Sequence, residues 1–195
     1  MKLRINKQEL LEILQQWNRF MHRKVRLVAC GGTAMTLLNV KDSTKDVDFM
    51  VPEIGEYDYL ISVIKDLGYT NIRGYGWQRP GENFIFDLFQ GKAIHTTELL
   101  ASPLEEGRHS VYEVLNRIEI FILNDYDLIS SKMMRGEGVD FDDCLALLKA
   151  HEEQIDLDKL RMCFNELVAY DISEDRIKGN MDMLLQRFSG GEHYG

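Results

Sequence analysis

Apolar and polar residues follow two different patterns in the first part of the chain. Over residues 6–20, apolar side chains recur every three or four positions, which predicts an amphipathic helix with one buried face. The next apolar run, residues 26–30, is short and continuous and leads into Gly31-Gly32, so it predicts a buried strand followed by a tight turn. A helix is expected directly after the glycines, at residues 33–38.

A second strand is predicted at residues 46–51, after a polar stretch that suits a loop. Asp46 and Asp48 stand at positions i and i+2 of this strand, so both side chains are expected on one face, with Val47 and Phe49 on the other. The pattern then predicts a helix, a loop and two strands, at residues 57–67, 75–82, 83–89 and 117–123 in that order.

The last third of the chain has only helical periodicity. Helices are predicted at residues 125–135 and 140–151, and the remainder to residue 188 also reads as helical, with a stripe of Leu160, Phe164, Leu167 and Val168. The predicted organisation is a core of helix and mixed sheet, a helical region packed on that core and a loose tail, at residues 1–124, 125–188 and 189–195.

Composition narrows the class of protein. With 45% hydrophobic and 28% charged residues, the chain is expected to fold almost throughout. A net charge of −9 argues against broad, sequence-independent binding of nucleic acid. The sequence has three widely spaced cysteines, no signal-like apolar segment and no run long enough to span a membrane, so reduced thiols, a cytoplasmic location and no membrane partner are expected.

Three carboxylates are candidates for chemistry. Two aspartates on one face of a strand repel each other unless a cation or donors intervene, so Asp46 and Asp48 are predicted to hold a hard cation such as Mg²⁺ or Mn²⁺. Asp87, within a later apolar strand, would complete a second metal site or take a proton from an attacking hydroxyl; its alternative is an edge-strand charge that limits aggregation.

The glycine pair is the other candidate for chemistry. Gly31 and Gly32 would let backbone N–H groups approach a phosphate at the start of the following helix, and Thr33 stands at that start. A Gly-Gly turn of this kind is also often only a tight connection between a strand and a helix.

Taken together, these segments resemble the signature of the nucleotidyltransferase superfamily: Leu27-Val28-Ala29-Cys30-Gly31-Gly32-Thr33-Ala34, then Thr44-Lys45-Asp46-Val47-Asp48-Phe49. The resemblance implies an α/β (α+β) fold, a minimal polymerase-β-like mixed sheet flanked by helices. It also implies that Gly31, Gly32 and Thr33, with Lys45, bind a nucleoside triphosphate (NTP) and that Asp46 and Asp48 bind the metal. Lys45 departs from the pattern, because an arginine is more usual there.

A second block extends the resemblance. Residues 125–135 followed by residues 140–143 are similar to the later block of abortive-infection toxin-type and related uncharacterised nucleotidyltransferases. By that resemblance Lys132 would neutralise phosphate charge, and Asp140 would orient Lys132 or assist the acceptor. The alternative for Lys132 is a solvated lysine near a helix end, and the alternative for Asp140 is a helix N-terminal charge. Residues 136–139 are less basic than expected for a polynucleotide acceptor.

Three functions follow as hypotheses. The first is a metal-dependent nucleotidyltransferase that acts on a macromolecule such as tRNA or protein, in the manner of a toxin with a cognate antitoxin, or on a small molecule such as an antibiotic. The second is a catalytically inactive nucleotide-binding or partner-binding module. In the third, the helical region mainly mediates association, including formation of a homodimer, through Leu160, Phe164 and Leu167.

Overall fold

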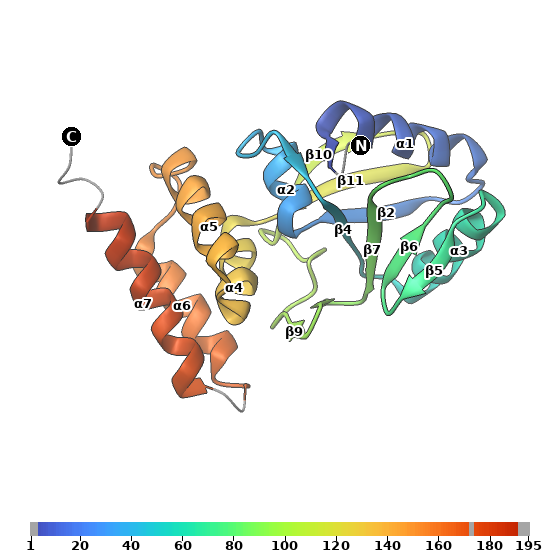
Figure 1. Cartoon of the computed structure of the whole chain (residues 1–195). Coiled ribbons are helices and arrows are strands. Elements are labelled where there is room, and N and C mark those ends of the chain that lie inside the picture. The colour runs from blue at the N-terminus through green and yellow to red at the C-terminus, as the bar shows by residue number, and fades with distance from the viewer. Residues whose placement is uncertain (1–3, 172–173, 191–195) are drawn as a thin grey trace. The chain divides into compact units, whose positions relative to one another are not determined.

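The computed structural model describes residues 4–171 and 174–190 (Figure 1). The chain divides into two compact units within the bounds Met1–Leu123 and Asn124–Gly195. The first unit contains the helices α1 (Lys7–Phe20), α2 (Gly31–Leu37) and α3 (Ile54–Asp66). Its strands are β1 (Ile5–Asn6), β2 (Val25–Ala29), β3 (Ser43–Thr44), β4 (Asp46–Val51), β5 (Thr70–Arg73), β6 (Gly76–Gln78), β7 (Ile85–Gln90), β8 (Ala93–Ile94), β9 (Thr97–Glu98), β10 (His109–Val114) and β11 (Ile118–Leu123).

Seven of these strands form one mixed sheet in the order β10-β11-β2-β4-β7-β6-β5. The pairs β11–β2 and β4–β7 are parallel, and the remaining neighbours are antiparallel. Two short pairs, β1–β3 and β8–β9, lie outside this sheet. The predicted fold class, a mixed sheet with flanking helices followed by a helical region, is therefore confirmed.

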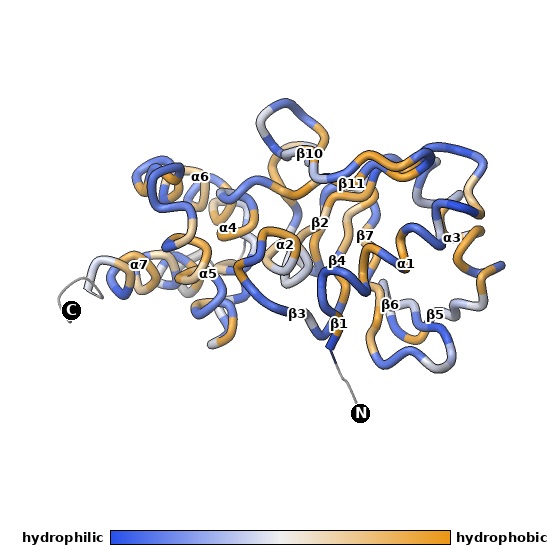
Figure 2. The backbone as a smooth tube through the Cα atoms, turned by 90° about the horizontal axis from the view of Figure 1, so that it is seen from above, coloured by the Kyte–Doolittle hydropathy of each residue, from blue (hydrophilic) through white to orange (hydrophobic). Residues whose placement is uncertain are grey.

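The two faces of β4 and β7 have different characters. Val47, Phe49 and Phe86 are fully buried on one face, where the Trp17 ring of α1 lies 4.6 Å from the Phe86 ring. Because side chains alternate along a strand, the three aspartates of β4 and β7 belong to the opposite face. Figure 2 shows the hydrophobic colour along much of β2 and β11 and the alternating hydropathy of α1.

The second unit consists of four helices among the described residues, α4 (Asp125–Arg135), α5 (Gly138–Ala150), α6 (Leu157–Val168) and α7 (Glu174–Gly190). The stripe of α6 is buried inside this unit: Leu160 and Phe164 are fully buried and Leu167 is 6% exposed. α6 packs against both α4 and α7. The hypothesis that this stripe faces another subunit is therefore wrong, because the unit's own helices cover it.

Several boundaries differ from the sequence predictions. The stretch predicted as a loop contains β6, and both β5 and β10 were missed, because the exposed side chains of β5 and the half-exposed ones of β10 give no clear alternation. Helix α7 continues to Gly190, two residues into the predicted tail, and residues 191–195 lie outside the described residues. In the part of the chain that the structure describes, no helix has the length and apolar character needed to cross a membrane.

Candidate functional site

A row of residues crosses four neighbouring strands of the large sheet. Asp48 of β4 is the register partner of Asp87 of β7 in their parallel pairing. Asp87 is in turn the partner of Gly76 in β6, and Gly76 is the partner of Arg73 in β5. Since directly opposed residues share a face of a sheet, the row brings Arg73 to the face that carries the aspartates.

Asp46 completes a group of three carboxylates on this face. It stands two residues before Asp48, and its side chain is 32% exposed, whereas Asp48 and Asp87 are buried. The structure thus places on one face of the sheet the three aspartates that the sequence singled out in the first unit. Closely spaced carboxylates repel one another, so this arrangement requires a cation or hydrogen-bond donors.

The glycine pair lies directly against two side chains of this region. Gly31 has a φ of +53°, and a Cβ atom built there would lie 2.5 Å from Oδ2 of Asp48. A Cβ atom at Gly32 would lie 2.5 Å from Oγ1 of Thr44. Position 31 therefore requires a glycine, because its backbone is left-handed and because the Asp48 carboxylate lies so close to it.

Thr33 and Thr44 hold the strand that carries the aspartates. The backbone N–H of Asp48 donates to the buried hydroxyl of Thr33 at 2.8 Å, and the hydroxyl of Thr44 donates to the carbonyl of Asp46 at 2.8 Å. These bonds fix β4 relative to α2 and β3. Contact of Thr33 with a nucleotide stays a prediction, as does that of Lys45, which is exposed at the bend before β4.

Arg73 is a functional candidate that the sequence did not reveal. Its Nη2 atom lies 3.5 Å from Oδ2 of Asp87 and 3.7 Å from Oδ1 of Asp46, and its side chain is 59% exposed. A Cβ atom at Gly76 would lie 2.9 Å from Cγ of Arg73 and 3.1 Å from Oδ1 of Asp87. The missing side chain at Gly76 therefore leaves the space in which Arg73 reaches the carboxylates.

The environment of Asp87 changes its acidity. Burial raises the pKa of the Asp87 carboxyl above its usual value, although the charge of Arg73 acts in the opposite direction. The neighbouring Asp46 also raises this pKa, and His95 lowers it. His95 lies in the turn between β8 and β9, with its ring 4.7 Å from that of Phe89.

Residues 4–171 and 174–190 contain no metal site built from protein ligands alone, because no three His, Cys, Asp or Glu side chains lie close enough together to hold one ion. Mg²⁺ does not require such a site, because it commonly binds through one or two carboxylates with water and substrate phosphates as the other ligands. A guanidinium cation already lies beside Asp46 and Asp87. The carboxylate oxygens of Asp46, Asp48 and Asp87 are of the kind that a hard divalent cation prefers.

Lys132 and Asp140, the other two predicted residues, belong to the second unit, and the structure brings them together. The ammonium of Lys132 is buried and donates to Oδ2 of Asp143 at 2.7 Å and to Oδ1 of Asp140 at 3.3 Å. Arg135 donates twice to Asp140, at 2.8 and 2.6 Å. The alternative of a solvated lysine is therefore wrong: Lys132 is part of a buried ionic network.

The network shifts the pKa values of Lys132 and Asp140. Burial acts to lower the pKa of Lys132, but Asp143 and Asp140 outweigh it and raise this pKa above its usual value. Burial acts to raise the pKa of Asp140, but the hydrogen bonds and charges of Arg135 and Lys132 outweigh it and lower this pKa. Asp140 also accepts from the backbone N–H of Glu137 at 3.2 Å, so it caps α5, in agreement with the helix N-terminal role considered for it.

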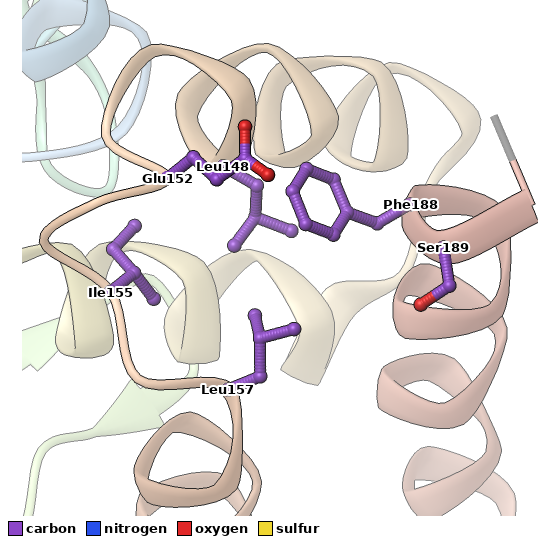
Figure 3. A pocket seen from close by; sticks show the side chains of 6 residues that line it. All are labelled: Leu148, Glu152, Ile155, Leu157, Phe188 and Ser189. Atoms are coloured by element: carbon purple, nitrogen blue, oxygen red, sulfur yellow. The ribbon is translucent and has the colours of Figure 1, made fainter. Parts of the chain in front are cut away.

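The second unit also contains a pocket, shown in Figure 3, at the ends of its helices. It is lined by Leu148, Glu152, Ile155, Leu157, Phe188 and Ser189. Glu152 is its single charged side chain, and none of the residues that the sequence singled out lines it. The pocket therefore adds nothing to the candidate chemistry.

Solved structures with similar backbones have low identity to this chain. JHP933 from Helicobacter pylori is 14% identical, with a TM-score of 0.46 and 97% of each chain covered. An antigenic nucleotidyltransferase-like protein from Paracoccidioides brasiliensis is 12% identical, with a TM-score of 0.49 and 92% of this chain and 94% of that chain covered. The nucleotidyltransferase toxin MenT4 from Mycobacterium tuberculosis is 18% identical, with a TM-score of 0.44 and coverage of 86% and 66%, respectively.

No curated protein matches the chain. A family model, described as nucleotidyltransferase of unknown function, matches residues 8–189. This match spans most of both compact units, and it confirms the resemblance to nucleotidyltransferases that the glycine pair and the Asp46-x-Asp48 motif indicated. The chain therefore belongs to the DUF6036 family of nucleotidyltransferases.

Proposed function

We propose that the protein is a Mg²⁺-dependent enzyme that transfers a nucleotidyl group from an NTP to an acceptor. The observation that carries this proposal is the placement of Asp46, Asp48 and Asp87 on one sheet face, with the backbone of Gly31 against the Asp48 carboxylate. Such a face offers oxygen ligands for a divalent cation beside a backbone turn that a phosphate can approach.

In this proposal Asp46 and Asp48 hold Mg²⁺ or Mn²⁺, and Gly31 and Gly32 keep the adjacent space free of side chains. When bound, the ion supplies positive charge that offsets the charge of the triphosphate. Thr33 holds the backbone of Asp48, so the metal-binding carboxylate stays at the glycine turn. We propose no phosphate contact for Lys132, because its ammonium is buried and paired with Asp140 and Asp143.

Asp87 is the proposed proton acceptor, with a share in metal binding as the alternative. The acceptor hydroxyl forms a bond to the α-phosphorus of the NTP while the bond from that phosphorus to the β-phosphate bridging oxygen breaks. Pyrophosphate leaves with the bonding electrons, and the hydroxyl proton passes to a carboxylate oxygen of Asp87. Asp87 suits this role because it is the register partner of Asp48 and shares its face.

The proposed acceptor is a macromolecule such as tRNA or protein, in which case the cell would need a cognate antitoxin to restrain a toxin-like activity. A small-molecule acceptor is the alternative, and the net charge of −9 favours it, because an acidic protein attracts a polynucleotide poorly. We place the reaction in the cytoplasm, where the three cysteines, which form no disulfide in the structure, are expected to stay reduced.

Calorimetric titration with each of the four common NTPs, with and without Mg²⁺, tests the proposal. The wild-type chain is compared with Asp46→Ala/Asp48→Ala and with Asp42→Ala/Asp58→Ala, a control that removes two exposed carboxylates. We expect Mg²⁺-dependent binding that only the first double variant loses, followed by incorporation of labelled nucleotide into an acceptor. No binding to any NTP would move the assignment to an inactive partner-binding module on the same fold.

A further inference from the structure

Arg73 occupies an unusual position for an exposed arginine. Its strand, β5, is the edge strand of the sheet, and the turn that follows, with Gly74 at a φ of +35°, returns the chain to β6. The register Arg73–Gly76–Asp87 then carries the guanidinium across β6 to the carboxylates. The sheet itself therefore places a fixed positive charge at the face where the proposed function requires a metal ion.

The contacts of Arg73 are long and exposed. The distances of 3.5 and 3.7 Å exceed those of a close ion pair, and more than half of the side chain faces solvent. Exposed ion pairs of this kind stabilise a fold little. The guanidinium therefore offsets the repulsion between Asp46 and Asp87 without being held firmly in place.

We propose that Arg73 is a displaceable counter-cation: it neutralises Asp46 and Asp87 while no divalent cation is bound, gives way when the ion enters, and then binds the triphosphate. This inference rests on the proposed function. A guanidinium released beside a bound triphosphate has phosphate oxygens as its strongest available partners. The same side chain thus opposes binding of the ion alone and favours binding of the ion together with the nucleotide.

Arg73 thus has opposite effects on the binding of the metal ion alone and on the binding of the nucleotide. This difference in sign distinguishes the proposal from a purely structural role of Arg73. If Arg73 only joined β5 to β7, its removal would lower the thermal stability and leave the affinity for a metal ion unchanged or weaker. If Arg73 were only a phosphate ligand, its removal would weaken nucleotide binding and leave the affinity for the metal alone unchanged. Of these three roles, only competition between Arg73 and the metal ion for the carboxylates predicts that removing Arg73 makes metal binding tighter.

The experiment uses the full chain with Arg73→Met, Arg73→Lys and the control Arg161→Met, which removes the same charge from an exposed ion pair with Asp182 in the second unit. Electron paramagnetic resonance of free Mn²⁺ measures the affinity for the metal alone, and calorimetry measures binding of NTP in saturating Mg²⁺. Thermal unfolding shows whether each variant remains folded.

For Arg73→Met we expect Mn²⁺ binding that is about 3- to 10-fold tighter and NTP binding that is about 10-fold weaker. Arg73→Lys should keep Mn²⁺ binding near the wild-type value and restore NTP binding only in part, because an ammonium lacks the forked donors of a guanidinium. Arg161→Met should change neither affinity.

Mn²⁺ binding that is unchanged or weaker in Arg73→Met would overturn the competition, whatever happens to the nucleotide. Failure of the proposed function would have a different result: the wild-type chain would bind Mn²⁺ but no NTP, and the Mn²⁺ comparison would still decide whether Arg73 competes for Asp46 and Asp87.

Discussion

Asp87 lies opposite Asp48 in the parallel pairing of β7 with β4, so two carboxylates from distant parts of the sequence share one level of the sheet. Parallel pairing, unlike a hairpin, depends on a connection that crosses over, and here α3 and the β5–β6 hairpin form it. The pairing of these two aspartates is therefore a property of the tertiary fold. The role of each can be tested by substitution with asparagine, which keeps the shape of the side chain.

Asp48→Asn should reduce nucleotide transfer to background while the fold stays intact. The amide keeps the size of the side chain but removes one charge from a group of like charges, so the free energy of unfolding should be unchanged or raised by up to about 1 kcal/mol. Incorporation of labelled nucleotide and urea unfolding measure the two effects. Transfer at the wild-type rate would show that the metal assignment is wrong.

Asp87→Asn should abolish transfer and stabilise the fold slightly. The raised pKa of Asp87 means that its ionised form is disfavoured by the folded environment at neutral pH, so replacing it with a neutral amide should raise the Tm by about 1–3 °C. Differential scanning calorimetry at pH 7 measures this change. A lower Tm than wild type would indicate that the ion pair with Arg73 outweighs the cost of burial.

Gly31→Ala should damage both stability and metal binding. The new Cβ atom would meet Oδ2 of Asp48, and the alanine would have to adopt the left-handed backbone of Gly31. We therefore expect the free energy of unfolding to fall by about 2 kcal/mol. Both tryptophans lie in the first unit, and their fluorescence during urea unfolding reports on it.

The matched control is Gly55→Ala in α3, where a Cβ meets nothing within 4 Å. It should raise stability by up to about 1 kcal/mol, because alanine favours a helix. Equal effects of the two substitutions would contradict the close approach between Gly31 and Asp48.

Lys132→Met should destabilise the second unit by about 3–5 kcal/mol, because it removes the cation that two buried carboxylates face. The exposed Lys149→Met, in the last turn of α5, should change stability by less than about 0.5 kcal/mol. Far-UV circular dichroism in urea follows the helices of the chain, the greater part of which belong to this unit. A loss of under about 1 kcal/mol for Lys132→Met would contradict the structural role of the network.

The same network predicts a dependence of stability on pH. The pKa of Asp140 is lower in the folded chain than in the unfolded chain, so its stabilising contribution is present above the unfolded value of about 3.9 and is lost as the pH falls through the folded value. Acid unfolding followed between about pH 5 and 2 should be less steep for Asp140→Asn than for wild type. Identical slopes would argue against this assignment.

The sequence predicted the elements whose side chains are buried on a regular period. Helix α1, strands β2, β4, β7 and β11, and helix α4 all lie within a few residues of their predicted positions. The position of Asp46 and Asp48 on one face followed from the two-residue period of a strand. Family membership also followed, because the glycine pair and the aspartate pair are local patterns.

Arg73 could not be predicted in the same way. The four residues of β5 are all exposed, so no alternation marks the strand, and a single surface arginine carries no signal of its own. Its approach to Asp87 depends on the register of two hairpin pairings and on the empty space at Gly76. Likewise, the pairing of Lys132 with Asp143 depends on how α4 packs against α5.

The short turn between β5 and β6 has a consequence for how this protein can change. Side chains alternate between faces along a strand, so an insertion or deletion of one residue between Arg73 and Gly76 that still left a two-residue turn would shift the pairing and turn Arg73 to the opposite face of the sheet. The strands could still pair, and the three aspartates would keep their positions. The register of this hairpin would therefore decide whether a variant of this chain carries a positive charge over its carboxylates.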